Sequence, residues 1–410
     1  MSQRLKENNY QLANAERCFS ILNFQLLEDL FAAYFDARRN KRNTINQLRF
    51  ELDFERNLLE LYEQLLDRSY TISPSIAFIV TNPVQREIFA ADFRDRILHH
   101  LLYNYMGPVI ERQLIDDCYS CRKMKGTHYG VQRMTQFLKD CSENYTRDCY
   151  ILKLDIRGYF MSIDKPILWE KLERLLRPMT EADCSDMDLM WWLLDKVIWH
   201  DPTQSCIIKC DRSNWIGLPP SKSLFHTGKN CGLPIGNLTS QLFSNVYLHE
   251  FDSFVKNDLG FEYYGRYVDD FVLVHPDKKV LLQAKEKIDS YLKETCRLEL
   301  HPNKIYLQHY RKGVAFIGAY IKPHRNYVSN RTKKKFINLM YKTHESLSKR
   351  PPTQATLSSL RSSVNSYLGI MRHYKTYNIR KKVLLSKTRP HALLKYGYLC
   401  VKRRGMVFRL

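Results

Sequence analysis

The segment YYGRYVDDFVLVH, residues 263–275, combines two strand-forming runs with two adjacent carboxylates between them. Tyr, Phe and Val dominate the runs and favour β-strands. Asp269 and Asp270 repel each other, and a sheet gains nothing from like charges side by side. A solvated hairpin tip is one explanation, because Asp is common in turns. The other explanation is a multivalent cation bound at the turn.

A third carboxylate follows an apolar strand elsewhere in the chain. In DCYILKLDIRGYFMSID, residues 148–164, the apolar run leads directly into Asp155. If this strand and the hairpin are neighbours, the three carboxylates converge and divalent cations must neutralise them. Mg²⁺ suits such a cluster because it takes hard oxygen ligands together with substrate phosphates. Two ions about 3.5–4 Å apart would activate a 3′-hydroxyl and stabilise a leaving pyrophosphate.

Length and composition indicate a globular protein with more than one folding unit. The chain has 410 residues, of which 44% are hydrophobic and 26% charged. The first residues, MSQRLKENNY, lack the apolar core of a signal peptide, and no apolar run approaches the roughly 18 residues of a membrane span. Eleven scattered cysteines favour free thiols in a reducing compartment. We therefore expect a cytoplasmic protein without a membrane partner.

The net charge of +21 is concentrated in the last quarter of the chain. From Leu300 onward there are 25 Lys and Arg residues and one acidic residue, Glu345. Such clustering, with aromatic residues interleaved, predicts binding to a phosphate backbone. A solubilising surface or a membrane-facing basic face is the alternative. The candidate nucleic-acid contacts are Arg38, Arg39, Arg122, Lys123, Lys333, Lys334, Lys335, Arg372, Arg380 and Lys381.

The remaining patterns give a coarse order of elements. Apolar spacing predicts helices over about residues 14–68, interrupted by the basic connector ARRNKRNT. A strand in YTISPSIAFIV and a strand leading into a helix in REIFAADFRDRILHHLLYNYM follow. GLPIGNLTSQLFSNVYLHEFDSFV reads as a Gly/Pro loop before a helix, and LELHPNKIYLQ and GVAFIGAYI as short strands. The rest is expected to be mainly helical.

Several of these segments together resemble a known family. DIRGYFMSID, GLPIGNLTSQ, YVDD, LHPNK and VAFIGAYI occur in the order of the palm motifs of reverse transcriptases, and REIFAADFRDRIL resembles their fingers block. The resemblance covers about residues 50–325 and implies an α+β right-hand polymerase. The implied parts are a helical N-terminal extension (1–68), fingers (69–147), a palm (148–323) with an insertion at about 178–230, and a basic helical thumb (324–410).

The resemblance also assigns the chemistry of the carboxylates. Asp155, Asp269 and Asp270 would be catalytic and would bind two Mg²⁺ ions, with Mn²⁺ as an alternative. The backbone carbonyl of Ile156 would be a further metal ligand. Template RNA, the cDNA product and deoxynucleoside triphosphates are the implied partners.

Further residues match positions that bind the incoming nucleotide. Phe160 matches the steric gate, where a bulky ring collides with a ribose 2′-hydroxyl; an ordinary core Phe is the alternative. Lys304 matches the lysine that approaches the triphosphate and protonates pyrophosphate; a surface Lys is the alternative. Arg86 aligns with the fingers arginine whose planar fork grips phosphate. Arg94 and Arg96 are its rivals and are more typical of ion pairs. VAFIGAY resembles the primer grip.

The block GLPIGNLTSQ narrows the subfamily. Ile235 replaces the Gln of most reverse transcriptases, and Ser240-Gln241 replaces Ser-Pro, so Ile235, Gly236 and Gln241 are expected to line the nucleotide site. This pattern, RDRILHHLL and SSVNSYLGIMRHYKTYNIRKK resemble reverse transcriptases of diversity-generating retroelements. Those enzymes copy a template repeat with errors at adenines, aided by a small basic accessory protein. Ile cannot hydrogen-bond the nucleotide as Gln would, and we expect lower fidelity.

Other interpretations of the same residues stay open. Defence-associated reverse transcriptases share the palm and use a noncoding RNA, for which the insertion and the basic tail would be suited. A catalytically inactive palm that only binds RNA is less consistent with intact carboxylates. Cys118-x₂-Cys121 and Cys206-x₃-Cys210 have zinc-like spacing, although no zinc-ribbon pattern surrounds them. Self-association is not decided by the sequence.

Overall fold

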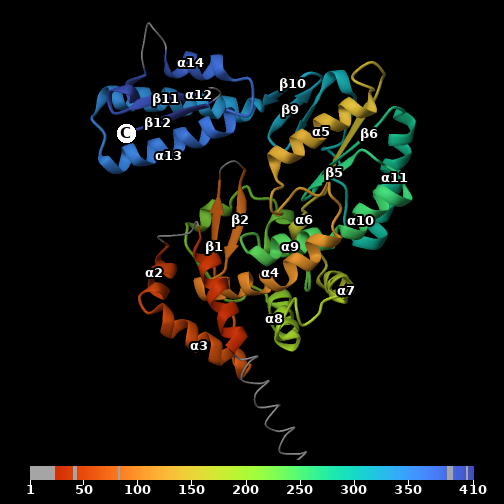
Figure 1. Cartoon of the computed structure of the whole chain (residues 1–410), viewed down its shortest axis with the longest axis vertical. Coiled ribbons are helices and arrows are strands. Elements are labelled where there is room, and N and C mark those ends of the chain that lie inside the picture. Colours follow the sequence, from red (N-terminus) through yellow and green to blue (C-terminus); the bar gives the residue numbers. More distant parts are fainter. Residues whose placement is uncertain (1–23, 40–43, 82–83, 386–390, 403–404) are drawn as a thin grey trace, which may run out of the picture. The chain divides into compact units, whose positions relative to one another are not determined.

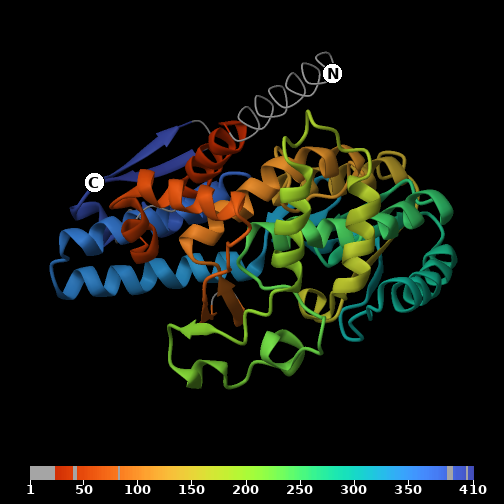
Figure 2. The ribbon, with the colours of Figure 1, turned by 90° about the horizontal axis from the view of Figure 1, so that it is seen from below.

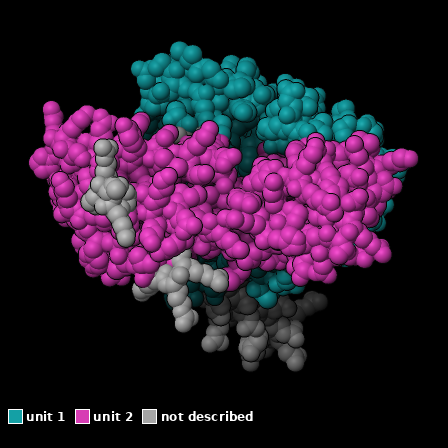
Figure 3. Space-filling model, turned by 90° about the horizontal axis from the view of Figure 1, so that it is seen from above, with its two compact units in different colours: residues 1–123, 154–262, 283–305 teal, residues 124–153, 263–282, 306–410 magenta. Residues whose placement is uncertain are grey.

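The computed structural model describes residues 24–39, 44–81, 84–385, 391–402 and 405–410. The chain divides into two compact units, which Figure 3 shows in different colours. Unit 1 comprises residues 1–123, 154–262 and 283–305, and unit 2 comprises residues 124–153, 263–282 and 306–410. None of the helices in the described part of the chain is long and apolar enough to cross a membrane.

Unit 1 is mainly helical (Figure 1). Its helices are a helix over residues 24–38, α2 (Ile45–Glu51), α3 (Phe54–Leu66), α4 (Phe93–Gln113), α6 (Tyr159–Ser162), α7 (Lys165–Leu176), α8 (Met187–Trp199), α9 (Leu238–Tyr247), α10 (His249–Ser253) and most of α11 (Lys278–Cys296). Helix α4 contacts α2, α7, α8 and α9 and is buried along most of its length. Its apolar residues surround the axis, as expected of a helix inside a core.

The helices predicted over residues 14–68 are confirmed where the structure describes them. Residues 14–23 and residues 40–43 of the basic connector lie outside the described residues. The strand and helix predicted in REIFAADFRDRILHHLLYNYM are also confirmed, as β2 (Arg86–Ala90) and α4. Asp92 caps α4 by accepting the N–H of Arg94 at 3.2 Å, which explains why the helix begins there.

The sheet of unit 1 is built from distant parts of the chain. Its order is β2-β1-β4, where β1 (Ser75–Val80) pairs antiparallel with β2 and parallel with β4 (Cys206–Ile208). Strand β4 belongs to the segment suggested as an insertion, which continues through the 3₁₀ turns η1 (Arg212–Trp215), η2 (Pro220–Lys222) and η3 (Leu224–His226). In Figure 2 this green segment runs beside the orange strands β1 and β2.

One face of this sheet carries a small hydrophobic core, here named the β2 cluster. Its buried members are Ala77, Phe89, Met161 and Leu224, and the partly buried residues packed against them are Phe160, Cys206, Ile208, Trp215 and Ile235. The cluster therefore joins β1, β2, α6, the suggested insertion and the Gly/Pro loop. Two residues expected in the nucleotide site, Phe160 and Ile235, lie in it.

Unit 2 contains a four-stranded sheet with the order β5-β6-β3-β7. The strands are β5 (Tyr264–Tyr267), β6 (Asp270–His275), β3 (Tyr150–Asp155) and β7 (Tyr306–His309); the last two residues of β3 are counted with unit 1. Helix α5 (Thr127–Cys141) packs on β5 and β6. The predicted hairpin and the predicted strand before Asp155 are both confirmed, and the two lie in one sheet.

A second antiparallel sheet in unit 2 has the order β10-β9-β8, with β8 (Val314–Phe316), β9 (Ala319–Lys322) and β10 (Arg325–Val328).

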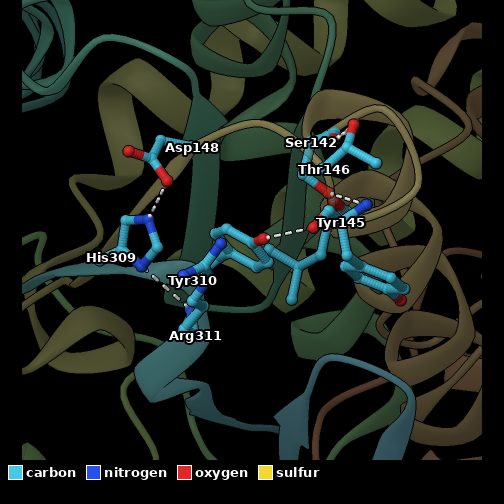
Figure 4. A network of polar contacts seen from close by, with 8 residues as sticks. Ser142, Tyr145, Thr146, Asp148, His309, Tyr310 and Arg311 are labelled. Atoms are coloured by element: carbon cyan, nitrogen blue, oxygen red, sulfur yellow. Dashed lines mark hydrogen bonds and ion pairs between the residues drawn. The ribbon is translucent and has the colours of Figure 1, made fainter.

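A polar network of side chains fixes the end of β7 (Figure 4). His309 Nδ1 accepts the N–H of Arg311 at 3.3 Å, so its Nε2 donates to Asp148 Oδ1 at 3.0 Å. The Tyr310 hydroxyl donates to the Tyr145 carbonyl at 3.0 Å, and the Tyr145 ring contacts His324 between β9 and β10. The network links both sheets.

The basic end of the chain has its own core. Helices α12 (Asn330–Lys349), α13 (Gln354–Met371) and α14 (Tyr377–Leu384) confirm the predicted helical character. Ser329 and Thr353 cap α12 and α13 by accepting backbone N–H groups. The sequence interpretation missed the hairpin of β11 (Tyr398–Lys402) and β12 (Gly405–Arg409), whose apolar runs YLCV and MVF are short and end at charged residues. Phe408 of β12 is buried in this core.

Candidate active site

Asp155 lies at the end of β3, where a loop of the same unit runs alongside it. The N–H of His301 donates to the Asp155 carbonyl at 2.8 Å, and Ile156 forms a β-bridge with Leu300. Lys304 follows in this loop, and its Nζ lies 2.7 Å from Asp155 Oδ1. The structure therefore brings together two residues that the sequence assigned to the reaction from segments about 150 positions apart.

The YVDD turn in unit 2 is held in an uncommon backbone conformation. Tyr267 and Asp270 face each other in the β5–β6 pair, which leaves Val268 and Asp269 as the two turn residues. Val268 has a φ of 59°, which is rare for a β-branched residue and indicates local strain. Beneath it, the fully buried Arg266 donates from Nη1 to the Val268 carbonyl at 2.9 Å. Strained turns of this kind concentrate at functional sites.

Lys153 is a site residue that the sequence interpretation missed. Its Nζ lies 3.1 Å from Asp270 Oδ2, within unit 2. It also stands two positions before Asp155 on β3, so alternation along the strand directs both side chains to one face. That spacing was the available signal. Asp155 and Asp270 are thus each paired with an ammonium group.

The Gly/Pro loop before α9 is fixed to its neighbours by backbone hydrogen bonds. The N–H of Leu233 donates to the Phe160 carbonyl at 2.8 Å, and the N–H of Phe89 donates to the Ile235 carbonyl at 3.0 Å. At Gly236, φ is 139° and an added Cβ would lie 2.9 Å from the Phe89 carbonyl oxygen. Only glycine fits there, because a side chain would push the loop away from β2.

Phe160 and Ile235, the expected gate and the unusual loop residue, share the β2 cluster. Both are partly buried, so each has one side in the core and another outside it. Part of the Phe160 side chain therefore packs in a core, as the alternative to the steric gate predicts. The neighbouring Tyr159 is buried and donates its hydroxyl to the Ser244 carbonyl at 2.5 Å, which fixes α6 on α9. Gln241, also expected in this site, is exposed on α9.

The three arginines proposed to bind triphosphate differ in their surroundings. Arg86 opens β2 and is exposed. Arg94 donates to the Gln64 side chain and lies over the Tyr70 ring at 4.9 Å. Arg96 is half-buried, and burial lowers the pKa of its guanidinium. Arg86 is consequently the one of the three that combines exposure with a position beside the β2 cluster.

Several expected nucleic-acid contacts serve the protein's own structure. Arg38 pairs with Glu51 at 2.5 Å, and Arg39 pairs with Asp36 at 3.2 Å. Arg122 donates to the backbone carbonyls of Glu111 in the last turn of α4 and of Ile115 and Cys118 after this helix. These guanidinium groups already have partners within unit 1.

Among the expected nucleic-acid contacts in unit 2, Arg380 is the buried one. Arg380 is only 2% exposed, so the expectation that it contacts a phosphate backbone is not supported by this structure. Desolvation also lowers the pKa of its guanidinium. The exposed candidates are Lys123 in unit 1 and Lys334, Arg372 and Lys381 in unit 2, and Lys333 and Lys335 are half-buried.

The cysteine pairs with zinc-like spacing have other partners. Cys118 Sγ donates to Asn245 Oδ1 at 3.3 Å, and Cys210 Sγ accepts the N–H of Ile79 at 3.4 Å. Within the described residues, no group of three or more His, Cys, Asp and Glu side chains is gathered as a metal-binding set. The structure gives no support to a structural zinc.

Comparisons with known proteins identify the class to which this fold and these motifs belong. A family model described as "Reverse transcriptase (RNA-dependent DNA polymerase)" matches residues 81–321, more than half of the chain. The chain therefore belongs to the reverse transcriptase family. Membership confirms the predicted α+β right-hand polymerase class and, at the level of the family, the predicted class of enzyme.

Individual relatives are distant. Protein YkfC of Escherichia coli (strain K12) is 23% identical over 292 residues, which cover 63% of this chain and 69% of YkfC. Apo telomerase from Candida tropicalis, truncated from its C-terminal domain, matches with a TM-score of 0.45 and 13% identity over 66% of this chain. Candida albicans telomerase in complex with a telomeric RNA fragment matches with a TM-score of 0.42 and 11% identity over 82% of this chain. This chain spans 59% of each of these telomerase chains.

Proposed function

We propose that this protein is an RNA-directed DNA polymerase that extends a primer along an RNA template with deoxynucleoside triphosphates. One observation carries the proposal. The chain is a member of the reverse transcriptase family, and its strained YVDD turn leads into β6. Strand β6 is the neighbour, in one sheet, of β3, the strand that ends in Asp155. The pairing of Lys153 with Asp270 and of Lys304 with Asp155 adds that these carboxylates accept cations.

Asp155, Asp269 and Asp270, with the Ile156 carbonyl, would hold two Mg²⁺ ions, or Mn²⁺ in their place. Bound metal would supply activation of the primer 3′-hydroxyl and stabilisation of the leaving pyrophosphate. Hard, negatively charged carboxylate oxygens are the ligand type that Mg²⁺ prefers. Lys153 and Lys304, which pair with Asp270 and Asp155, would be the ammonium groups available to phosphate oxygens at this site.

The other residues act on the substrates. Arg86 binds the triphosphate through its exposed guanidinium. Phe160 excludes a ribose 2′-hydroxyl with the part of its ring outside the β2 cluster. Lys304 holds a proton near the carboxylates and donates it to the departing pyrophosphate. The exposed Lys and Arg residues of α12 and α14 bind the template–primer backbone.

Primer extension on an RNA template tests the proposal. Asp269→Asn keeps the size of the side chain but removes its charge, so we expect incorporation of dNTPs to fall by about 10³-fold or more. Asp289→Asn is the matched control, because Asp289 lies on α11, outside the motifs, where it pairs with Lys293. Undiminished incorporation by Asp269→Asn, or a wild type unable to copy RNA with Mg²⁺ or Mn²⁺, would refute the proposal.

For the biological role, we propose error-prone copying at template adenines, as in diversity-generating retroelements. Ile235 and Ser240-Gln241 in the loop support it. A defence-associated enzyme with a dedicated noncoding RNA is the second candidate, supported by the long segment at residues 178–230. Sequencing the RNA that co-purifies with the protein separates them: a template repeat supports the first candidate, and a structured RNA without a matching repeat supports the second. The same purification would reveal an accessory protein or self-association.

A further inference from the structure

We infer that residues 203–230 brace the nucleotide-binding strand β2, and that Glu87 is the positioning residue that fixes this brace. The inference rests on the proposed function, because it takes Arg86 and Ile235 to contact the incoming nucleotide. It assigns the segment a role in nucleotide binding instead of a separate RNA-binding arm.

Glu87 is a buried carboxylate whose hydrogen bonds all go to the brace. It lies on β2 and is 1% exposed. Its Oε2 accepts the Trp215 Nε1–H and the Ser223 hydroxyl, both at 2.7 Å, and its Oε1 accepts the Leu224 N–H at 2.6 Å. A buried charge is stable only with such partners, so these three donors hold the brace to β2.

Arg86 is flanked by contacts to the brace on both sides along the chain. The preceding residue, Gln85, donates from Nε2 to the carbonyls of Asn214 at 2.7 Å and Ile216 at 3.2 Å. The following residue is Glu87. The exposed guanidinium of Arg86 thus projects from backbone that is tied on either side to the same segment, which limits its orientations before a triphosphate arrives.

The brace also supplies part of the apolar surface against which Ile235 of the Gly/Pro loop packs. Trp215 and Leu224 belong to the β2 cluster together with Ile235. At Gly158, two residues before Phe160, an added Cβ would lie 2.7 Å from the Ser221 carbonyl oxygen, so the brace closely approaches the turn that leads to the expected gate. Arg86, Phe160 and Ile235 therefore share one support.

As a positioning residue, Glu87 should affect the binding of the nucleotide more than the chemical step. Loosening the brace widens the range of positions open to Arg86 and Ile235, and the carboxylates are unchanged. We expect Glu87→Gln to raise the KM for dNTP by about tenfold, because one or two donors lose a charged acceptor, with kcat within about twofold of wild type. Trp215→Phe removes a single N–H donor and should raise KM by about threefold.

The experiment combines kinetics with a structural readout. Primer extension at varied dNTP concentration gives KM and kcat for wild type, Glu87→Gln, Trp215→Phe and the control Glu181→Gln, an exposed carboxylate outside the brace. Limited trypsin digestion without substrate reports the brace directly, because Lys209, Arg212, Lys222 and Lys229 are exposed cleavage sites within it. Faster cleavage at these sites in Glu87→Gln, together with a raised KM, is the expected result.

The outcomes distinguish this inference from the proposed function. Faster cleavage with an unchanged KM would overturn the inference while the wild type still copies RNA. An equal loss of kcat and of kcat/KM, with KM unchanged, would also overturn the inference, because that pattern belongs to the chemical step. A wild type without polymerase activity would refute the proposed function, and unchanged cleavage in both brace variants would then refute the brace itself.

Discussion

The β2 cluster of unit 1 and the YVDD turn of unit 2 both hold candidate functional residues, but different interactions support the two regions. Around β2, the support is apolar packing and hydrogen bonds to a single buried carboxylate, Glu87. At the turn, it is a buried arginine, a strained Val268 and the ion pair of Lys153 with Asp270. Packing defines shape, whereas paired charges bind cations. Under the proposed function, the first region would select the nucleotide and the second would support the chemistry.

The two regions also differ in charge along the chain. Residues from Leu300 onward carry 25 basic residues and one acidic residue, and most of this stretch belongs to unit 2. The β2 cluster has uncharged side chains alone, with Glu87 satisfied beside it. Substitutions in the cluster should therefore change which nucleotide is used, and substitutions at the carboxylates should change whether any is used.

The largest effect within the β2 cluster is expected at Phe160. Removing the ring in Phe160→Ala opens space for a 2′-hydroxyl, so the preference for dNTP over rNTP in kcat/KM should fall by about 10- to 100-fold. Phe35→Ala is the control, because Phe35 is 55% exposed on the helix over residues 24–38, outside the β2 cluster and the brace. A Phe160→Ala enzyme that still rejects rNTPs as the wild type does would show that Phe160 is a core residue alone.

A smaller effect concerns the response of unit 1 to acid. Burial lowers the pKa of His99 to about 3 and that of His100 to about 4, both in unit 1. Below pH 6.5 the unfolded chain binds protons that the folded chain does not take up until about pH 3–4. Stability is therefore lost as pH falls, by roughly 1.4 kcal/mol per pH unit for each group.

Tryptophan fluorescence measures this loss selectively, because all five tryptophans lie in unit 1. Urea midpoints at pH 7 and pH 5 should differ clearly in the wild type and less in His99→Gln, where a neutral amide replaces the ring that bonds Thr239 Oγ1 at 2.8 Å. Identical pH dependence in the two proteins would show that His99 is not the group responsible.

The sequence was most informative where a pattern depends on neighbouring residues. The hairpin, the strand before Asp155 and the loop–helix of GLPIGNLTSQ were predicted because alternation and turn residues are local signals. Asp155 and Lys304 were predicted from motifs whose pairing the structure reveals. The strands β11 and β12 were missed because their apolar runs, YLCV and MVF, are very short and end at charged residues.

The supporting residues of the site were not predicted, for a physical reason. Glu87, Lys153 and Arg266 are charged residues next to recognised motifs, and sequence alone cannot tell a buried charge from a solvated one. The role of Glu87 depends on hydrogen-bond donors that lie more than 120 positions away in the sequence. Arg266 supports the turn from inside the sheet, where charged residues are uncommon.

The division between selection and chemistry is tested most directly by single-nucleotide incorporation opposite a template adenine. Wild type, Ile235→Gln, Asp269→Asn and the packing control Ile235→Leu are compared for matched dTTP and for mismatched dNTPs. We predict that Ile235→Gln keeps matched incorporation and lowers misincorporation by about fivefold, that Ile235→Leu behaves as wild type, and that Asp269→Asn loses both equally. An unchanged error spectrum in Ile235→Gln, or selective loss of mismatches in Asp269→Asn, would contradict this division.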